Sequence, residues 1–200
     1  MGAETKDQLI DAAIRTIDEH GEAALRIREV SEEVGVAYTS VYHFFGSREG
    51  LVEAAQFERY RRDLAEPLER FRATMGTITS KAEFRDAVTT MLTWVFTIDR
   101  APNRLDRTSA LGSALGRPDL ADRFAELHEE HISDLAAVMR EPQLRGWVRP
   151  ELDLRMVSGW YMGVVLGRII IEFGGERPEH DAWNDIATNA VLSTLLTPDD

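Results

Sequence analysis

The chain has 200 residues, contains no cysteine and carries a formal net charge of −12 at pH 7. This length suffices for one large helical domain, or for a domain of about 50 residues beside a larger one. The lack of cysteine excludes disulfides, thiolate metal sites and a cysteine nucleophile. Residues 1–11 lack the apolar core of a signal peptide, and the apolar run 156–171 is interrupted by Arg168 and is shorter than the roughly 20 residues of a membrane span. We therefore expect a cytoplasmic globular protein that does not enter a membrane, with 156–171 as a buried helix.

Helix signals are dense along the chain and strand signals are weak. Apolar residues recur with a helical period, and capping residues, glycines and prolines mark the ends of the segments. The expected helices cover residues 6–20, 27–34, 37–45, 48–66, 81–99, 104–115, 118 to the connection at 142, 152–173 and 179–196. The sequence thus predicts an all-α fold of about nine helices.

Several of these boundaries depend on single residues. Thr5, three residues before Gln8, and Ser80, three residues before Glu83, are typical of capping boxes. Pro67 is expected to end or kink the fourth helix because proline lacks a backbone donor. Two more prolines should lie at boundaries, Pro102 closing one helix and Pro118 opening another.

The last two expected helices are the most apolar pair in the chain. Gly159, Gly163 and Gly167 recur every four residues, which places them on one helix face and allows another helix to approach closely. Either a second subunit or a helix of the same chain could fill that face. We predict a homodimer whose interface uses Gly159, Gly163, Gly167, Trp183, Ala187, Ala190 and Val191.

Residues 27–45 have the layout of a helix-turn-helix unit, in which a second short helix enters the DNA major groove. Total charge argues against DNA binding, because residues 1–50 contain five basic and ten acidic residues. Residues 34–48, however, contain no acidic residue, and only charges within about a Debye length of a phosphate act strongly on it. Local charge therefore permits a DNA-reading surface that the net charge disfavours.

Short segments between Leu9 and Leu51 form a distinctive pattern. They are Asp11-Ala12-Ala13, Gly21, Ile27-Arg28-Glu29-Val30, Gly35-Val36 and Val41-Tyr42-His43-Phe44-Phe45-Gly46-Ser47-Arg48-Glu49. This pattern closely resembles the N-terminal signature of the TetR family of transcription regulators, over about a quarter of the chain. The resemblance implies a three-helix DNA-binding domain over residues 1–46, with a helical effector-binding and dimerisation domain over 47–200.

The resemblance also implies roles for individual side chains on a double-stranded DNA operator. Tyr42 and His43 would contact phosphates, Tyr38 and Thr39 would approach base edges, and Arg48 would bind phosphate. The full expected DNA-binding set is Arg28, Tyr38, Thr39, Ser40, Tyr42, His43 and Arg48. For Tyr42 and His43 the alternative is packing against the first helix or simple solvent exposure.

The chain departs from the family pattern at two helix starts and at one charge. Arg26 and Ala37 stand where the family has capping residues, so two caps of about 1 kcal/mol each are expected to be missing. Tyr38 replaces a common lysine, which predicts a weaker dependence of DNA affinity on salt or a different base preference.

The family implies a repressor that a small molecule releases from DNA. Bulky residues in the second domain favour a largely apolar or aromatic effector. The expected ligand-binding residues are Met91, Trp94, Phe124, His128, Trp160 and Tyr161. Polar residues that could orient the effector are Arg104, Arg107, His128 and His131. The identity of the effector, the operator and the target genes is not encoded in these patterns.

Three other readings compete with a regulator. His128 and His131 are three residues apart, which differs from the zinc-protease spacing, so we expect no metal site and no cofactor. No phosphate loop or nucleophile motif indicates an enzyme. A helical protein-interaction adaptor that has lost DNA binding fits the acidic charge and remains the alternative function.

Overall fold

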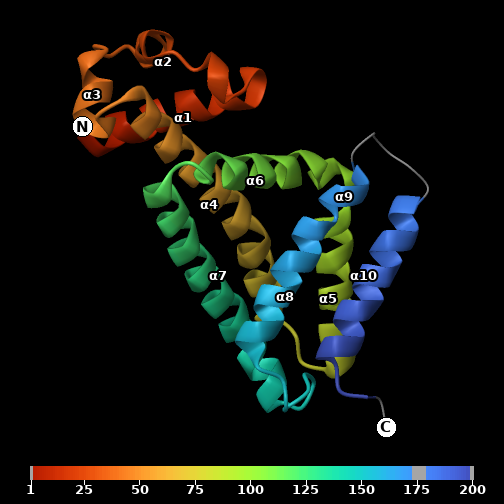
Figure 1. Ribbon diagram of the computed structural model, residues 1–200. Coiled ribbons are helices and arrows are strands. Elements are labelled where there is room, and N and C mark those ends of the chain that lie inside the picture. Colours follow the sequence, from red (N-terminus) through yellow and green to blue (C-terminus); the bar gives the residue numbers. More distant parts are fainter. Residues whose placement is uncertain (1, 173–178, 199–200) are drawn as a thin grey trace. The chain divides into compact units, whose positions relative to one another are not determined.

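The computed structural model describes residues 2–172 and 179–198. Its helices are α1 (Gly2–His20), η1 (Glu22–Ala24), α2 (Ile27–Val34), α3 (Thr39–Phe45), α4 (Arg48–Met75), α5 (Lys81–Phe96), η2 (Ile98–Arg100), α6 (Ala101–Ala114), α7 (Pro118–Leu144), α8 (Leu154–Gly167), α9 (Ile169–Glu172) and α10 (Glu179–Leu195) (Figure 1). Within these residues the β structure is limited to one bridge between Val148 and Leu196. Because a single residue separates α8 from α9, the predicted all-α fold of about nine helices is confirmed.

The chain forms two compact units. Unit 1 contains residues 1–62 and 109–124, and unit 2 contains residues 63–108 and 125–200. The α4, α6 and α7 helices therefore each contribute residues to both units. The division into a DNA-binding domain over 1–46 and an effector-binding domain over 47–200 stays a prediction.

Unit 1 holds the first three helices around a small apolar core. Leu9, Val30, Val41 and Leu51 are completely buried in it, one each from α1, α2, α3 and α4. Gly35 ends α2 in the left-handed conformation, which glycine adopts without steric cost. The short core and this tight turn confirm the predicted helix-turn-helix layout of α2 and α3.

One N-terminal boundary differs from the prediction. The α1 helix begins at Gly2, so Thr5 lies inside the helix and does not cap it. Glu4 in the first turn favours the earlier start, because a carboxylate is stabilised at the positive end of a helix. At the start of α4, the Ser47 hydroxyl caps the helix by accepting a hydrogen bond from the Gly50 amide at 3.0 Å.

The α4 helix also differs, because it continues through Pro67 to Met75. A proline inside a helix costs about 3 kcal/mol. Leu64, Leu68 and Phe71 are all buried on either side of it, and this apolar stripe keeps the helix intact across the missing hydrogen bond.

Further corrections concern the helices of unit 2. Pro102 lies in the first turn of α6, where its missing N–H has no intrahelical partner to lose, instead of closing the preceding helix. Pro142 lies inside the last turn of α7. The Ser80 capping box is confirmed, since the Ser80 hydroxyl accepts from the Glu83 amide and the Glu83 carboxylate accepts from the Thr79 amide.

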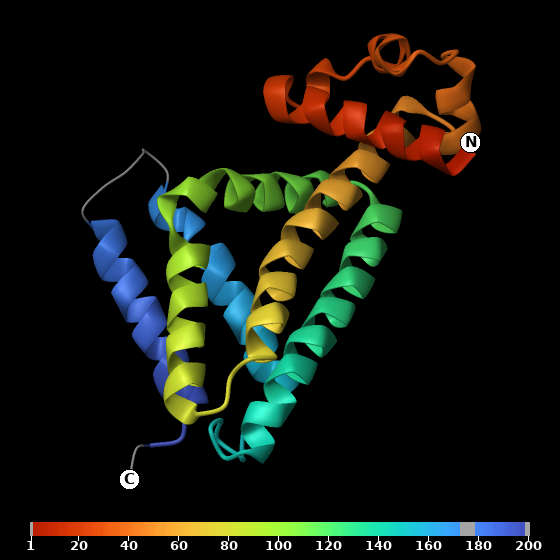
Figure 2. The same cartoon turned by 180° about the vertical axis from the view of Figure 1, so that it is seen from behind.

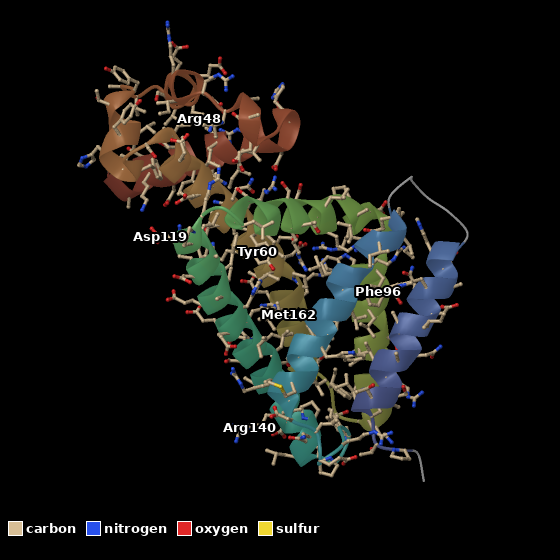
Figure 3. The ribbon with its side chains drawn as sticks, viewed as in Figure 1. Arg48, Tyr60, Phe96, Asp119, Arg140 and Met162 are labelled. Atoms are coloured by element: carbon tan, nitrogen blue, oxygen red, sulfur yellow. The ribbon has the colours of Figure 1, made fainter. Side chains whose placement is uncertain are left out.

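The apolar core of unit 2 lies mainly between α5 and α10, which run side by side (Figures 1 and 2). Phe84, Leu92 and Phe96 of α5 are almost completely buried there. Phe96 meets the Trp183 ring of α10 edge to face at 5.3 Å (Phe96 is labelled in Figure 3). Aromatic pairs of this geometry add to the free energy gained from burial alone.

The stretch Leu154–Glu172 is less enclosed than the sequence predicted. It is apolar and long enough to span a membrane by length and composition alone, yet only 17% of it is buried within the described chain. Met156 and Ile170 are both about two-thirds or more exposed. The single chain therefore leaves much of this apolar helix exposed, so the expected burial requires cover from outside the chain.

Candidate nucleic-acid interface

The α3 helix presents aromatic and polar side chains on one face. Tyr38 is 60% exposed, Tyr42 is 50% exposed, and their rings meet edge to face at 6.1 Å. His43 is also exposed. Val41 on the opposite side is completely buried. Burial of Val41 therefore fixes which face of α3 points outward.

An open hollow of about 490 Å³ adjoins this face. Thr39, Ser40 and His43 of α3 line it, together with Gly2 and Thr5 at the start of α1 and with Val36 and Phe44. Hydroxyl groups, an imidazole and backbone amides are frequent partners of DNA phosphates. No acidic side chain lines the hollow, so its wall offers nothing that repels an anion.

The two arginines expected to bind DNA are engaged within unit 1. Arg28 is 86% exposed and donates to Glu32 at 2.7 Å, one helical turn away. Arg48 (labelled in Figure 3) donates from Nε to the Leu25 carbonyl at 3.0 Å and from Nη2 to the Glu22 carbonyl at 2.6 Å. The structure thus places Arg48 as a tie to the turn before α2.

One basic residue near α3 was missed by the sequence reasoning. Lys6 of α1 is exposed, and its Nζ lies 6.0 Å from the centre of the Phe45 ring at the end of α3. Only the packing of α1 against α3 brings it there, because the two positions are far apart in sequence. Lys6 adds a positive charge that Tyr38 does not supply.

The predicted loss of helix caps is seen at both starts. Arg26 precedes α2 and makes no side-chain cap, since its guanidinium donates instead to the Ala23 carbonyl at 2.6 Å. At α3 the cap position is Tyr38 and not Ala37, and it too lacks a side-chain hydrogen bond. The α3 helix is consequently held by Val41 and by its C-terminal glycine more than by its start.

Glu22 in η1 forms the most connected polar joint of unit 1. Its carboxylate accepts hydrogen bonds from Arg117 at 2.6 Å, Ser113 at 2.8 Å and Gln56 at 3.2 Å. Burial alone would raise the pKa of Glu22, but these three hydrogen bonds and the charge of Arg117 lower it to about 2. The joint ties η1 to α4 and to the α6–α7 region, and sequence spacing gave no sign of it.

The residues predicted for the dimer interface divide into two groups. Gly163 and Gly167 have open space where a side chain would stand, whereas a Cβ at Gly159 would meet Ile132 at 3.6 Å. Ala187 and Val191 are buried in the core of unit 2, and the partly buried Trp183 packs against that core. That face of α10 packs on α5, and the dimer interface stays a prediction.

The residues predicted to bind an effector also fall in different places. Phe124 belongs to unit 1, where it stacks on Phe57 and contacts Tyr60. The remaining five belong to unit 2, with Met91, Trp94 and Tyr161 packed against its core. Trp94 has the Arg100 guanidinium 3.9 Å and the Arg70 guanidinium 4.4 Å from its ring.

The other two effector candidates are less deeply placed. Trp160 is 40% exposed on α8. His128 is half-buried, and burial lowers its pKa. In the described part of the chain, no group of three or more His, Asp or Glu side chains is arranged to hold a metal ion.

Comparison with known proteins identifies the N-terminal segment. Residues 9–55 match the sequence profile of the bacterial regulatory proteins of the tetR family. The HTH-type transcriptional regulator BetI of Stenotrophomonas maltophilia is 37% identical over 71 residues, which cover 36% of each chain. The Bacillus subtilis fatty acid metabolism regulator protein is 20% identical over 79% of this chain and 78% of its own. The match to BetI thus spans about a third of that relative's length.

Solved structures resemble the whole chain in fold. A TetR-family transcriptional regulator from Cytophaga hutchinsonii superposes with a TM-score of 0.71 at 14% identity, over 99% of this chain and 98% of the other. A Saccharomonospora viridis protein solved in complex with choline gives a TM-score of 0.66 at 18% identity, over 98% and 100%. At these identities the likeness concerns the fold.

Unit 1 holds a helix-turn-helix whose residues match those of bacterial regulatory proteins, and helices make up most of the rest of the described chain. Its N-terminal profile, its relatives and its fold all agree on the family. The N-terminal segment is therefore that of the tetR family of bacterial regulatory proteins, and the chain shares the fold of a solved TetR-family regulator.

Proposed function

We propose that the chain acts in the cytoplasm as a dimeric repressor, which binds a double-stranded DNA operator through α3 and leaves it when a small, largely apolar or aromatic effector binds. The observation that carries this proposal is the exposed face of Tyr38, Tyr42 and His43, which lies opposite the buried Val41. A helix presented in this way fits the major groove.

Within this proposal the exposed side chains contact two different parts of the DNA, the phosphates and the bases. Tyr42 and His43 contact phosphates, while Tyr38 and Thr39 approach base edges or a thymine methyl group. The hollow lined by Ser40 and Thr5 receives a backbone phosphate, and Lys6 adds charge beside it. Arg28 donates to Glu32 through Nε, and the Nη groups of this exposed side chain extend toward DNA.

The apolar face of α8 supports the dimer. Met156, Trp160 and Ile170 on α8 and α9, with Ile186 on α10, are exposed apolar side chains in the single chain. Contiguous exposed apolar side chains mark interaction surfaces, and a second copy of the same face would cover those of α8 and α9. The open space at Gly163 allows the partner helix to approach closely.

Two histidines of similar exposure provide the test. His43 lies on the reading face of α3, whereas His20 ends α1, and both are exposed. Fluorescence anisotropy on the chain's own upstream DNA, titrated with salt, should show His43→Ala binding about tenfold more weakly and His20→Ala binding as the parent does. Equal affinities would place the interface elsewhere. A parent protein with no salt-dependent DNA binding would favour the adaptor function.

A further inference from the structure

Unit 2 buries an unusual number of arginines. Arg100, Arg104 and Arg107 lie four and three residues apart, so they share one face of η2 and α6. Their side chains are only 11%, 2% and 12% exposed, and Arg168 between α8 and α9 is completely buried. Buried arginines need acceptors for their donors, because an unpaired charge away from water is costly.

Asp63 on α4 serves two of these arginines. Its carboxylate pairs closely with Nε of Arg107 and accepts from Asn103 at 2.7 Å. Arg100 approaches the same carboxylate with Nη2, but only to 3.7 Å, and this nitrogen is buried without a hydrogen-bond acceptor. The other end of Arg100 reaches Glu66, which is half exposed to solvent.

Glu172 on α9 serves the other two. It accepts from Nε and Nη2 of Arg104, whose remaining donors reach the Val95 and Thr97 carbonyls. Arg168 donates from Nε to Asn184 at 2.8 Å, but its Nη1 comes only within 3.5 Å of Glu172 and has no hydrogen-bond acceptor.

The two clusters therefore have the same composition. Each consists of two buried arginines that share one enclosed carboxylate, and each leaves one buried guanidinium nitrogen without an acceptor. Glu66 and Asp181 add negative charge nearby, but both are exposed, and water screens exposed charges strongly. The enclosed groups of these two clusters thus carry an excess of positive charge, and a bound oxyanion would supply the missing acceptors.

We infer that the effector is an amphiphilic anion, with an apolar or aromatic body and a carboxylate, sulfonate or similar oxyanion that pairs with the arginine clusters of Arg100 and Arg168. This inference rests on the proposed function, because it names the chemistry of the effector that the regulator senses. A cationic ligand would add a third positive group to each cluster and is disfavoured.

The pKa values of two titratable side chains, His131 and Tyr161, are consistent with positive charge at this place. Burial, with a contribution from the charge of Arg107, lowers the pKa of His131 to about 4, so its ring is neutral at pH 7. Burial raises the pKa of Tyr161 to about 12, although Arg107 and Arg100 act in the opposite direction. The charge of Arg107 therefore acts on both residues, and both side chains are neutral at pH 7.

A pair of fluorescent probes tests the charge preference directly. 8-Anilinonaphthalene-1-sulfonate and N-phenyl-1-naphthylamine share the same aromatic body, but only the first carries an oxyanion. The dimeric full-length protein should bind the sulfonate with a Kd at least ten times lower than that of the neutral amine. Arg168→Met and Arg100→Met should each lower this preference at least fivefold and leave the Kd of the amine within a factor of two.

The matched control is Arg155→Met, because Arg155 is an exposed arginine of α8 that pairs with Glu129 on the surface. It should keep the preference of the parent. Near-UV circular dichroism verifies that each variant is folded. If Arg168→Met does not fold, the relative affinity of the parent for the two probes still tests the preference for an anion. Equal affinities of the parent for the two probes, or a preference that survives in Arg100→Met, would overturn the inference.

Operator binding is measured on the same preparations without probe. Loss of DNA binding with an intact preference for the sulfonate would contradict the repressor and keep the anion site. Intact DNA binding with no preference for the sulfonate would contradict the anion site and keep the repressor.

Discussion

The Glu22 joint gives the sharpest stability prediction. Substituting Glu22→Gln removes the charge that holds Arg117 and weakens the hydrogen bonds from Ser113 and Gln56. The pKa of Glu22 falls from an ordinary 4.5 to about 2. For a fully shielded group this shift would correspond to about 3 kcal/mol. Because the Glu22 side chain is 30% exposed, solvent screening reduces the expected loss to about 1–2 kcal/mol.

The sign of the pH dependence follows from the lowered pKa. The folded state binds the Glu22 proton less tightly than the unfolded state, so the contribution is complete above pH 4.5 and disappears as the pH falls to about 2. The parent should therefore exceed Glu22→Gln in free energy of unfolding at pH 7, and the difference should vanish near pH 2.

Urea unfolding at a series of pH values measures both quantities. The control is Glu19→Gln, because Glu19 is 68% exposed and lies 3.8 Å from His20, its nearest basic group. This control should stay within about 0.5 kcal/mol of the parent. A Glu22→Gln variant that matches the control at pH 7, or whose deficit persists unchanged to pH 2, would refute the reasoning.

Two further substitutions test the architecture. Arg48→Met should lower the free energy of unfolding by about 2 kcal/mol, because it removes charge-assisted hydrogen bonds to two backbone carbonyls; thermal melts should show no comparable loss for the exposed Arg28→Met. Gly163→Leu should raise the dimer dissociation constant at least tenfold in sedimentation equilibrium, since the space beside Gly163 is open in the single chain; an unchanged dimer would contradict the α8 interface.

Local patterns were sufficient for most of the N-terminal unit. Gly35 and Gly46 end α2 and α3 as predicted, because left-handed caps are a property of the glycine itself. Ser80 caps α5 for a similar reason, since its partner is only three residues away. The exposed face of α3 agrees with local spacing, because Val41 and Phe45 lie one helical turn apart and both pack in the core of unit 1.

The predictions failed where burial opposes a local signal. Pro67 should end α4 by its chemistry, yet Leu64 and Phe71 are buried on either side of it and the helix continues. Val191 shares a stripe with Ala187 that suits an interface as well as a core. The sequence shows that such a stripe recurs with the helical period, but it does not show whether the stripe packs on a helix of the same chain or on a partner subunit.

The sequence by itself determined the fold class, the family signature and the helix-turn-helix layout of α2 and α3, because each arises from residues within a few positions of one another. Only the tertiary structure decided the partners of charged groups. Arg104 and Glu172 are 68 residues apart, and Glu22 and Arg117 are 95 apart. A buried charge is stabilised by whichever opposite charge the packing brings within a few ångströms, and sequence order carries no record of that choice.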